Sequence, residues 1–317
     1  MIARPARIAE SYESALRNEK WRRAKRMYAL YLLFLVPLVI LIIFRYVPIY
    51  GLSIAFVDYR YAKGMLGSPW NNFEHFRQLF ANPYFARLFR NTVIISVLKL
   101  VFGFPAPIIL ALILNEVQSA AFKRTVQSIS YLPHFLSWVV LSGIIIEMLS
   151  PQRGIVGYIY TLLGMEAPVI LYSQALFRPM LVVTAMWQGV GWGAVVYLAA
   201  IAGINPELYE SATVDGANRL QMAVRITVPS LIPVIVVLFI LSLGHLMEAG
   251  FDQILNLYNP LVWEVADIID TFVYRKGILD RQYDYATAVG LFKSLVGVCL
   301  LVATNMIIRR FSEYGIW

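Results

Sequence analysis

Long apolar runs separated by short polar segments organise this chain. The runs are continuous rather than alternating, and most approach the ~20 residues that a helix needs to cross the hydrocarbon layer of a bilayer. Because lipid offers no hydrogen-bond partners to the backbone, such runs predict helices and not barrel strands. The six predicted spans are Tyr28–Phe44, which we expect to continue through Val57, Thr92–Leu114, Leu132–Leu149, Pro179–Ile204, Leu231–Met247 and Ala286–Ile308.

Composition agrees with this pattern. Of the 317 residues, 59% are hydrophobic and 15% are charged, whereas about a quarter of the residues in a soluble domain are charged. The fold class is therefore predicted to be an all-α integral membrane protein with about six transmembrane helices. We divide the chain into a basic N-terminal tail, residues 1–27, and a transmembrane domain, residues 28–317.

Charge sets the expected orientation. With six spans both termini lie on one side, and that side carries 14 Lys and Arg residues against 10 on the other. The positive-inside rule places the richer side, and both termini, in the cytoplasm. Eight of the 14 lie in residues 1–27, whose basic cluster precedes a run too long for a cleaved signal peptide. The net charge of +8 then indicates contact with membrane lipid and not with nucleic acid.

Sequence motifs for catalysis are missing. The chain has no nucleophile elbow, no HExxH, no paired Cys-x-x-Cys and no phosphate-binding loop. We therefore predict no catalytic residue, no metal site and no cofactor bound by this chain. His134 is expected to hydrogen-bond at the start of the third span, and the glycines of Gly189–Gly193 are interpreted as sites of close helix packing.

Polar residues inside the spans are candidates for a transport pathway, because a charge at the bilayer centre is costly unless it faces protein or water. Four charged residues qualify, and they either fix helix packing by pairing or form a polar pathway: Lys99, Glu147, Glu248 and Lys293. Aromatic and amide groups suit sugar faces and hydroxyls, although they are also common in helix packing. The candidate pathway residues are Trp187, Gln188, Trp192, Tyr197, Glu248 and Asn256.

A polar segment, residues 205–229, interrupts the apolar pattern between the fourth and fifth spans. Asn205 is suited to cap a helix that has Pro206 at its first position. Glu207 lies near the positive end of that helix, and Asp215–Gly216 is a turn signal. The segment therefore predicts two short helices joined by a glycine turn. It forms a rigid projection at the inner membrane surface, where a soluble partner can bind.

This segment resembles the "EAA" signature of permease subunits in bacterial binding-protein-dependent (type I) ABC importers. The matching residues are Glu210-Ser211-Ala212, Gly216 and Ile226-Thr227-Val228-Pro229, with Ser211 and Val228 as mild departures. The resemblance implies that the segment is a coupling helix docked into a cleft on an ATP-hydrolysing subunit. The implied coupling residues are Glu207, Glu210, Ser211, Ala212, Asp215, Gly216, Ala217 and Arg219.

The resemblance covers nearly the whole chain, from YVPIYGLSIAFVDY to the terminal EYGIW. These stretches look like the lipoprotein/polysaccharide branch of sugar permeases, which is related to the larger maltose permease. The resemblance implies a multi-pass protein of the bacterial inner membrane that pairs with a second permease, two ATPase subunits carrying ATP and Mg, and an extracytoplasmic binding protein. The implied cargo is an oligosaccharide, with alginate-derived chains as one candidate. The long outer loop, residues 249–285, is expected to face the second permease and the binding protein.

Two other functions remain open at this point. A secondary transporter could use an ion gradient, with Glu147, Glu248, Lys99 and Lys293 as its relay, although such proteins usually carry internal repeats and this chain shows none. A membrane scaffold without transport is also compatible with the sequence. The preferred interpretation is ATP-driven alternating access, in which another subunit supplies the free energy.

Overall fold

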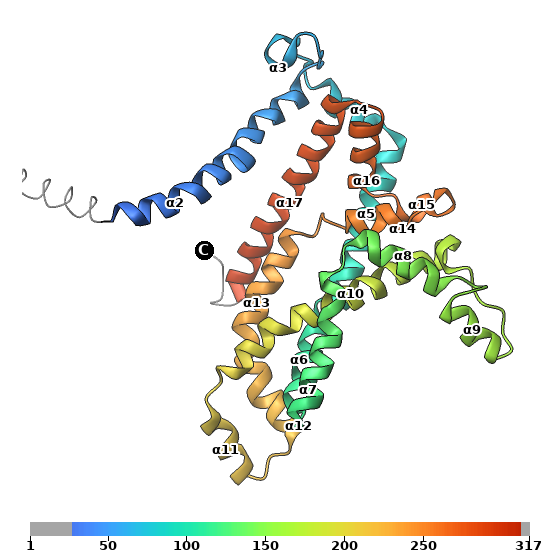
Figure 1. Cartoon of the computed structure of the whole chain (residues 1–317). Coiled ribbons are helices and arrows are strands. Elements are labelled where there is room, and N and C mark those ends of the chain that lie inside the picture. The colour runs from blue at the N-terminus through green and yellow to red at the C-terminus, as the bar shows by residue number, and fades with distance from the viewer. Residues whose placement is uncertain (1–26, 312–317) are drawn as a thin grey trace, which may run out of the picture.

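The computed structural model describes residues 27–311, and this part of the chain is helical (Figure 1). Its β-structure is one isolated bridge between Val57 and Trp70. Five helices are long and apolar enough to cross a membrane, and a sixth span is counted if one bent helix pair is included. The predicted fold class is confirmed.

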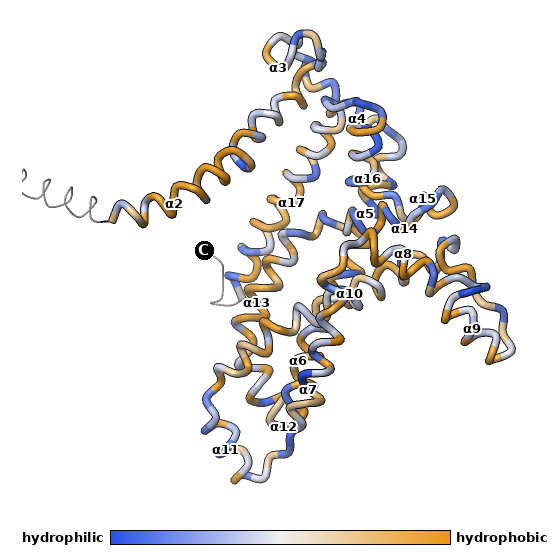
Figure 2. The backbone as a smooth tube through the Cα atoms, viewed as in Figure 1, coloured by the Kyte–Doolittle hydropathy of each residue, from blue (hydrophilic) through white to orange (hydrophobic). Residues whose placement is uncertain are grey.

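The first span extends well beyond Phe44. Helix α2, Tyr28–Leu41, continues through η1, Ile42–Tyr46, into η2, Val47–Phe56, which makes 29 helical residues. Pro48 does not end it, because proline is tolerated at the start of the tighter η2 turn. No residue of α2 is buried, and this mostly hydrophobic helix stands apart from the body of the molecule (Figure 2).

The second span is a 34-residue helical stretch made of α5, Pro83–Gly103, and α6, Pro105–Glu116. Asn82 caps its start by accepting a hydrogen bond from the backbone N–H of Tyr84 at 3.0 Å. Two short helices, α3, Gly64–Gly67, and α4, Glu74–Ala81, connect the first span to it.

The predicted third span, Leu132–Leu149, is wrong as a single helix. Helix α7, Ala120–Tyr131, and the short η3, Leu132–Phe135, end at a bend of 109°, and α8, Trp138–Leu149, leaves in a new direction. The sequence explains the break, because Pro133 lacks an N–H and Ser137 accepts a bond from Val140 N as the cap of a new helix. After α8 follow α9, Ile155–Leu162, and η4, Ile170–Tyr172.

The central helix of the fold is α10, Gln174–Ala202. It contacts α5, α6 and α7 along its length. The close-packing interpretation of the glycine run is confirmed for Gly191, where a Cβ would overlap the backbone carbonyl of Ser130 on α7. His134 is a correction: its Nδ1 has no hydrogen-bond partner among the described residues, and its ring instead stacks on Trp192 at 4.9 Å.

Beyond α10 the chain forms α11, Pro206–Val214, and then one continuous 26-residue helix, Arg219–Gly244. That helix comprises α12, Arg219–Met222, the wider turn η5, Ala223–Thr227, and α13, Val228–Gly244. The fifth span therefore begins about three turns before the predicted Leu231.

Residues 249–285 contain a run of short helices rather than an irregular loop. These are α14, Phe251–Leu257, η6, Pro260–Val262, α15, Trp263–Ala266, α16, Ile269–Tyr274, and η7, Arg275–Leu279. Several of their apolar side chains are fully buried: Ile254, Val262, Ala266, Ile268 and Ile269. The last span, α17, Tyr283–Phe311, then runs back beside α13 (Figure 1).

Candidate functional site

The coupling segment, residues 205–229, lies at one end of the molecule, opposite α3 (Figure 1). Asn205 Oδ1 accepts a hydrogen bond from Glu207 N at 3.1 Å, as the predicted cap requires. Gly216 has φ +77° with open space around it, so it makes the turn in a conformation that other residues rarely adopt. Asn218 then caps α12 through a reciprocal capping box with Gln221. The predicted helix–turn–helix is confirmed.

Two contacts fix helices α11 and α12 in place. The hydroxyl of Tyr209 on α11 lies 2.9 Å from Oγ1 of Thr227, which is almost fully buried at the start of α13. On α12, Arg219 Nη1 donates to the carbonyl of Glu116 at the end of α6 at 3.3 Å. The first contact holds α11 against the helix that continues into α13, and the second holds the start of that helix against the end of α6.

The surface of the coupling segment is suited to a protein partner. Of the predicted coupling residues, Ala212 and Ala217 are half-buried, and the others are exposed: Glu207, Glu210, Ser211, Asp215, Gly216 and Arg219. Sequence reasoning missed three apolar side chains beside them. Leu208, Val214 and Leu220 are 49%, 88% and 73% exposed, so apolar as well as charged side chains are open to a partner.

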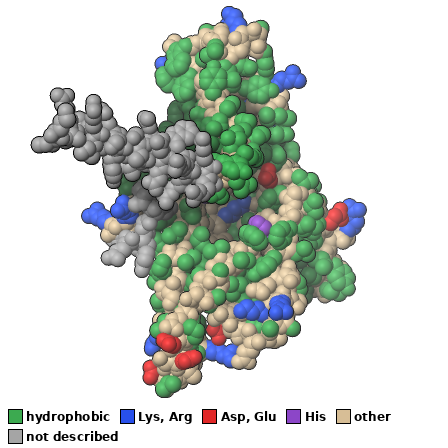
Figure 3. All heavy atoms as spheres, turned by 60° about the vertical axis from the view of Figure 1, so that its left-hand side comes forward, with side chains coloured by type: hydrophobic (Ala, Val, Ile, Leu, Met, Phe, Trp, Pro, Cys, Tyr) green, Lys and Arg blue, Asp and Glu red, His purple; other side chains and the backbone are tan. Residues whose placement is uncertain are grey.

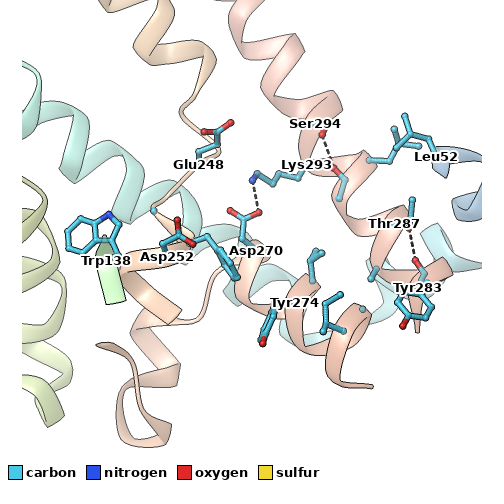
Figure 4. A pocket seen from close by; sticks show the side chains of 18 residues that line it. Leu52, Trp138, Glu248, Asp252, Asp270, Tyr274, Tyr283, Thr287, Lys293 and Ser294 are labelled. Atoms are coloured by element: carbon cyan, nitrogen blue, oxygen red, sulfur yellow. Dashed lines mark hydrogen bonds and ion pairs between the residues drawn. The ribbon is translucent and has the colours of Figure 1, made fainter. Parts of the chain in front are cut away.

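Two adjoining open cavities lie in the transmembrane region. The larger, about 870 Å³, is formed by the residues around α14, α16 and α17, and Figure 4 shows Glu248, Asp252, Asp270 and Lys293 on its wall. The smaller, about 520 Å³, lies between α5, α10 and α13. Glu248 lines both cavities, so they meet at the turn that follows α13.

The structure brings together only part of the predicted pathway set. Tyr197 and Glu248 line the same cavity. Trp187 is 41% exposed and Gln188 half-buried, and neither lines a described cavity; Trp192 packs on His134. Asn256 donates to the carbonyl of Asp252 within its own helix. The pathway role of all these residues stays a prediction.

The charged residues inside the spans differ in their contacts. Lys293 is paired with Asp270 at 2.5 Å across α16 and α17. Glu248 lies 3.3 Å from His245, and both side chains are largely exposed. Lys99 instead bonds to two neutral groups, Ala249 O and Gln253 Oε1. Sequence reasoning found the lysines and missed Asp270 and Gln253, because nothing local links residues that lie 23 and 154 positions away.

A second polar network fixes the outer segment, residues 249–285, to α5 and α10. Asn91 is fully buried and donates to the carbonyls of Glu264 and Asp267, each at 3.0 Å. Arg178 on α10 donates to Val265 O and to Asn91 Oδ1. Long-range bonds therefore determine the path of the segment.

Within the outer segment, Arg275 and Asp267 form a bidentate ion pair. Nη1 and Nη2 of Arg275 lie 2.8 and 2.5 Å from the two carboxylate oxygens. Burial by itself would lower the pKa of Arg275, but the hydrogen bonds and charge of Asp267, with a further bond to Tyr258, raise it above its ordinary value. Arg275 therefore remains a guanidinium cation that holds the segment together.

Comparison with known proteins identifies the family. Residues 103–314 match the family described as the inner membrane component of binding-protein-dependent transport systems. The chain belongs to this family. This permease is 42% identical, over 87% of its length and 86% of the relative's, to the polygalacturonan/rhamnogalacturonan transport system permease protein YteP of Bacillus subtilis. It is also 41% identical to protein LplB of the same organism, over 97% and 94% of the two chains.

Solved structures agree. The permease matches a chain from a crystal structure of a bacterial ABC transporter involved in the import of the acidic polysaccharide alginate. The TM-score is 0.84 at 41% identity, covering 93% of this chain and 99% of the other. A crystal structure of bacterial alginate ABC transporter in complex with alginate pentasaccharide-bound periplasmic protein matches with the same TM-score at 42% identity, with the same coverage. The predicted ABC sugar permease family is confirmed, and an ion-gradient transporter is not favoured.

Proposed function

We propose that this chain is one of two different permease subunits of an ATP-driven importer, and that its cargo is an oligosaccharide derived from an acidic polysaccharide. The observation that carries the cargo class is the chemistry shared by two relatives. One, at 42% identity, is named for polygalacturonan, and the other, at 41% identity, belongs to an alginate importer. Both polymers are built from uronic acids, whose carboxylates are ionised at neutral pH.

The proposed machine contains subunits besides this chain. An extracytoplasmic binding protein delivers the cargo, and two ATPase subunits hold ATP and Mg and contact the coupling segment. The permease itself carries out no hydrolysis and binds no nucleic acid. With the coupling segment in the cytoplasm, both termini lie there too, and membrane lipid covers the apolar outer surface.

The continuous helix from Arg219 to Gly244 suggests how movement is transmitted. It begins beside the coupling helix α11, which is fixed to it by the Tyr209–Thr227 bond. Its other end, through Leu238, Leu241 and Ser242, forms a wall of the smaller cavity. A shift of α11 when the ATPases close therefore moves one wall of the cavity, as alternating access requires.

Reconstitution with the partner subunits tests this function. Purified complexes in proteoliposomes are expected to transport an alginate tetrasaccharide only under two conditions. ATP must be present on the side of the membrane where the ATPase subunits lie, and binding protein must be present on the opposite side. Loaded binding protein should also accelerate ATP hydrolysis. Uptake that continues without ATP and stops when ion gradients are dissipated would contradict the proposal.

A further inference from the structure

Lys99 occupies an unusual place in the transmembrane region. It projects from α5, inside the second span, and lines the 520 Å³ cavity as well as a smaller one of about 200 Å³ beside α10. Its ammonium lies 2.7 Å from the carbonyl oxygen of Ala249 and 2.5 Å from Gln253 Oε1. Figure 3 shows a histidine with charged side chains near it, in a hollow at the middle of the face that it draws.

The positive charge of Lys99 is not balanced by a neighbouring carboxylate. Both of its hydrogen-bond partners are neutral, and it forms no ion pair with any residue that the structure describes. Lys293, in the adjoining cavity, is the opposite case, because Asp270 lies 2.5 Å away. Glu248 lines the same cavity, but its carboxylate pairs with His245 Nδ1, at 3.3 Å, and not with Lys99.

The surrounding residues hold the ammonium in place. Gln253 is fully buried, and its amide nitrogen donates to Leu181 O at 2.9 Å and to Thr184 Oγ1 at 2.7 Å on α10. This leaves its carbonyl oxygen directed at Lys99. Gly250 has φ +94°, and a Cβ at this position would lie 2.5 Å from Nζ. Residues of α5, α10 and α14, with the turn that precedes α14, thus surround the ammonium of Lys99.

We propose that Lys99 binds a carboxylate of the acidic cargo as it passes through the cavity, and so contributes to selection of anionic sugars. The inference rests on the proposed function and assigns recognition of the cargo's negative charge to one residue. An ammonium has three N–H donors, and two are used by Ala249 O and Gln253. The third is available to a uronate oxygen, and a hydrogen bond between two ionised groups is about twice as strong as a neutral one. Tyr197, Ser96 and Ser242, which line the same cavity from three helices, suit the sugar ring and its hydroxyls.

The test uses the complete transporter with its binding protein in proteoliposomes, and an alginate tetrasaccharide as cargo. Lys99→Gln removes the charge, and Lys99→Arg retains it. Gln253→Glu keeps the shape of the side chain and an acceptor for Lys99 while balancing the ammonium with a carboxylate. It also removes the amide donations to Leu181 O and Thr184 Oγ1, so its uptake is compared only after its thermal unfolding matches that of the unmodified complex. Lys276→Gln is the matched control, since Lys276 lies outside both transmembrane cavities and pairs with Asp280.

We expect Lys99→Gln and Gln253→Glu each to lower uptake per ATP hydrolysed by roughly ten- to a hundredfold, the loss typical of a charged hydrogen bond. Lys99→Arg and Lys276→Gln should stay close to the unmodified complex. ATP hydrolysis stimulated by loaded binding protein should remain, because the coupling segment is untouched.

Full uptake by Gln253→Glu would overturn the inference, and a loss confined to Lys99→Gln would show that Lys99 acts only by tethering the turn that contains Ala249. If Lys99→Gln fails to assemble, Gln253→Glu alone decides. If the unmodified complex imports a neutral oligosaccharide and no alginate tetrasaccharide, the proposed cargo class is wrong, and the role of Lys99 that rests on it is wrong as well. Normal alginate uptake by all variants would reject the role of Lys99 and leave the proposed function intact.

Discussion

The coupling segment and the outer segment contrast sharply, although both are polar interruptions of an apolar chain. In the coupling segment the structural signals are local: the cap at Asn205 bonds two residues away, and the one at Asn218 bonds three residues away. In the outer segment the decisive bonds are long-range, such as those from Asn91 to residues 173 and 176 positions distant. The first segment should therefore form its helices and turn with little help from the rest of the chain, to which Tyr209 and Arg219 attach it. The second should behave as part of the protein's core.

The largest effect is expected in the outer segment, at Asp267. Asp267→Ala leaves the half-buried guanidinium of Arg275 without its carboxylate, and breaking a buried pair costs about 3–5 kcal/mol. Thermal unfolding of the purified permease in detergent, followed by tryptophan fluorescence, measures this loss. Asp280→Ala is the control, because its pair with Lys276 is more exposed and should contribute about 0.5 kcal/mol or less. Equal effects of the two variants would show that the Asp267–Arg275 pair stabilises the outer segment no more than an exposed pair in the same segment does.

Gly216 gives the next largest effect, and it should change coupling without changing stability. Proline cannot adopt the positive φ of Gly216 and also removes its N–H bond to Thr213 O. Since such a substitution costs about 3 kcal/mol locally, Gly216→Pro is expected to reduce ATP-driven uptake at least tenfold. Gly216→Asn, which tolerates this conformation, should retain most uptake. A large fall in the unfolding temperature of Gly216→Pro would show that the coupling segment is not independent.

A smaller effect is expected at the contact between α11 and α13. Tyr209→Phe leaves the buried hydroxyl of Thr227 without its Tyr209 partner, at a cost of about 1–3 kcal/mol. Adding Thr227→Val replaces both partners with apolar groups and should restore most of the loss. Uptake per ATP, measured for the two single variants and the double variant, gives the coupling energy. Additive losses would mean that this bond does not transmit movement.

The smallest effect belongs to the cap of α11. Asn205→Ala removes the acceptor for Glu207 N and should destabilise the helix by about 1 kcal/mol, whereas Asn205→Asp keeps an acceptor. Hydrogen exchange of the backbone amides in residues 206–214 reports this change directly. Increased exchange that spreads to α13 would contradict the local character of the segment.

These contrasts explain what could be predicted from the sequence. The span helices, the caps at Asn205 and the turn at Gly216 depend on neighbouring residues, so periodicity and local chemistry predicted them. The bend before Trp138 was missed, even though Pro133 and Ser137 are local signals, because the apolar run continues through it. The partners of Lys99 and Lys293 were missed for a different reason. Gln253 and Asp270 lie in the segment interpreted as an outer loop, and only folding brings them beside α5 and α17.

Cross-linking from the coupling segment tests the central claim most directly. Ser211 is exposed on α11, and Cys299 is the single cysteine of the chain, so Ser211→Cys in a Cys299→Ala background gives one reactive site. Leu66→Cys, at a residue 90% exposed on α3, is the control at the opposite end. In the assembled transporter, Ser211→Cys should cross-link to an ATPase subunit and Leu66→Cys should not. Cross-linking of the ATPase to Leu66→Cys and not to Ser211→Cys would contradict this account.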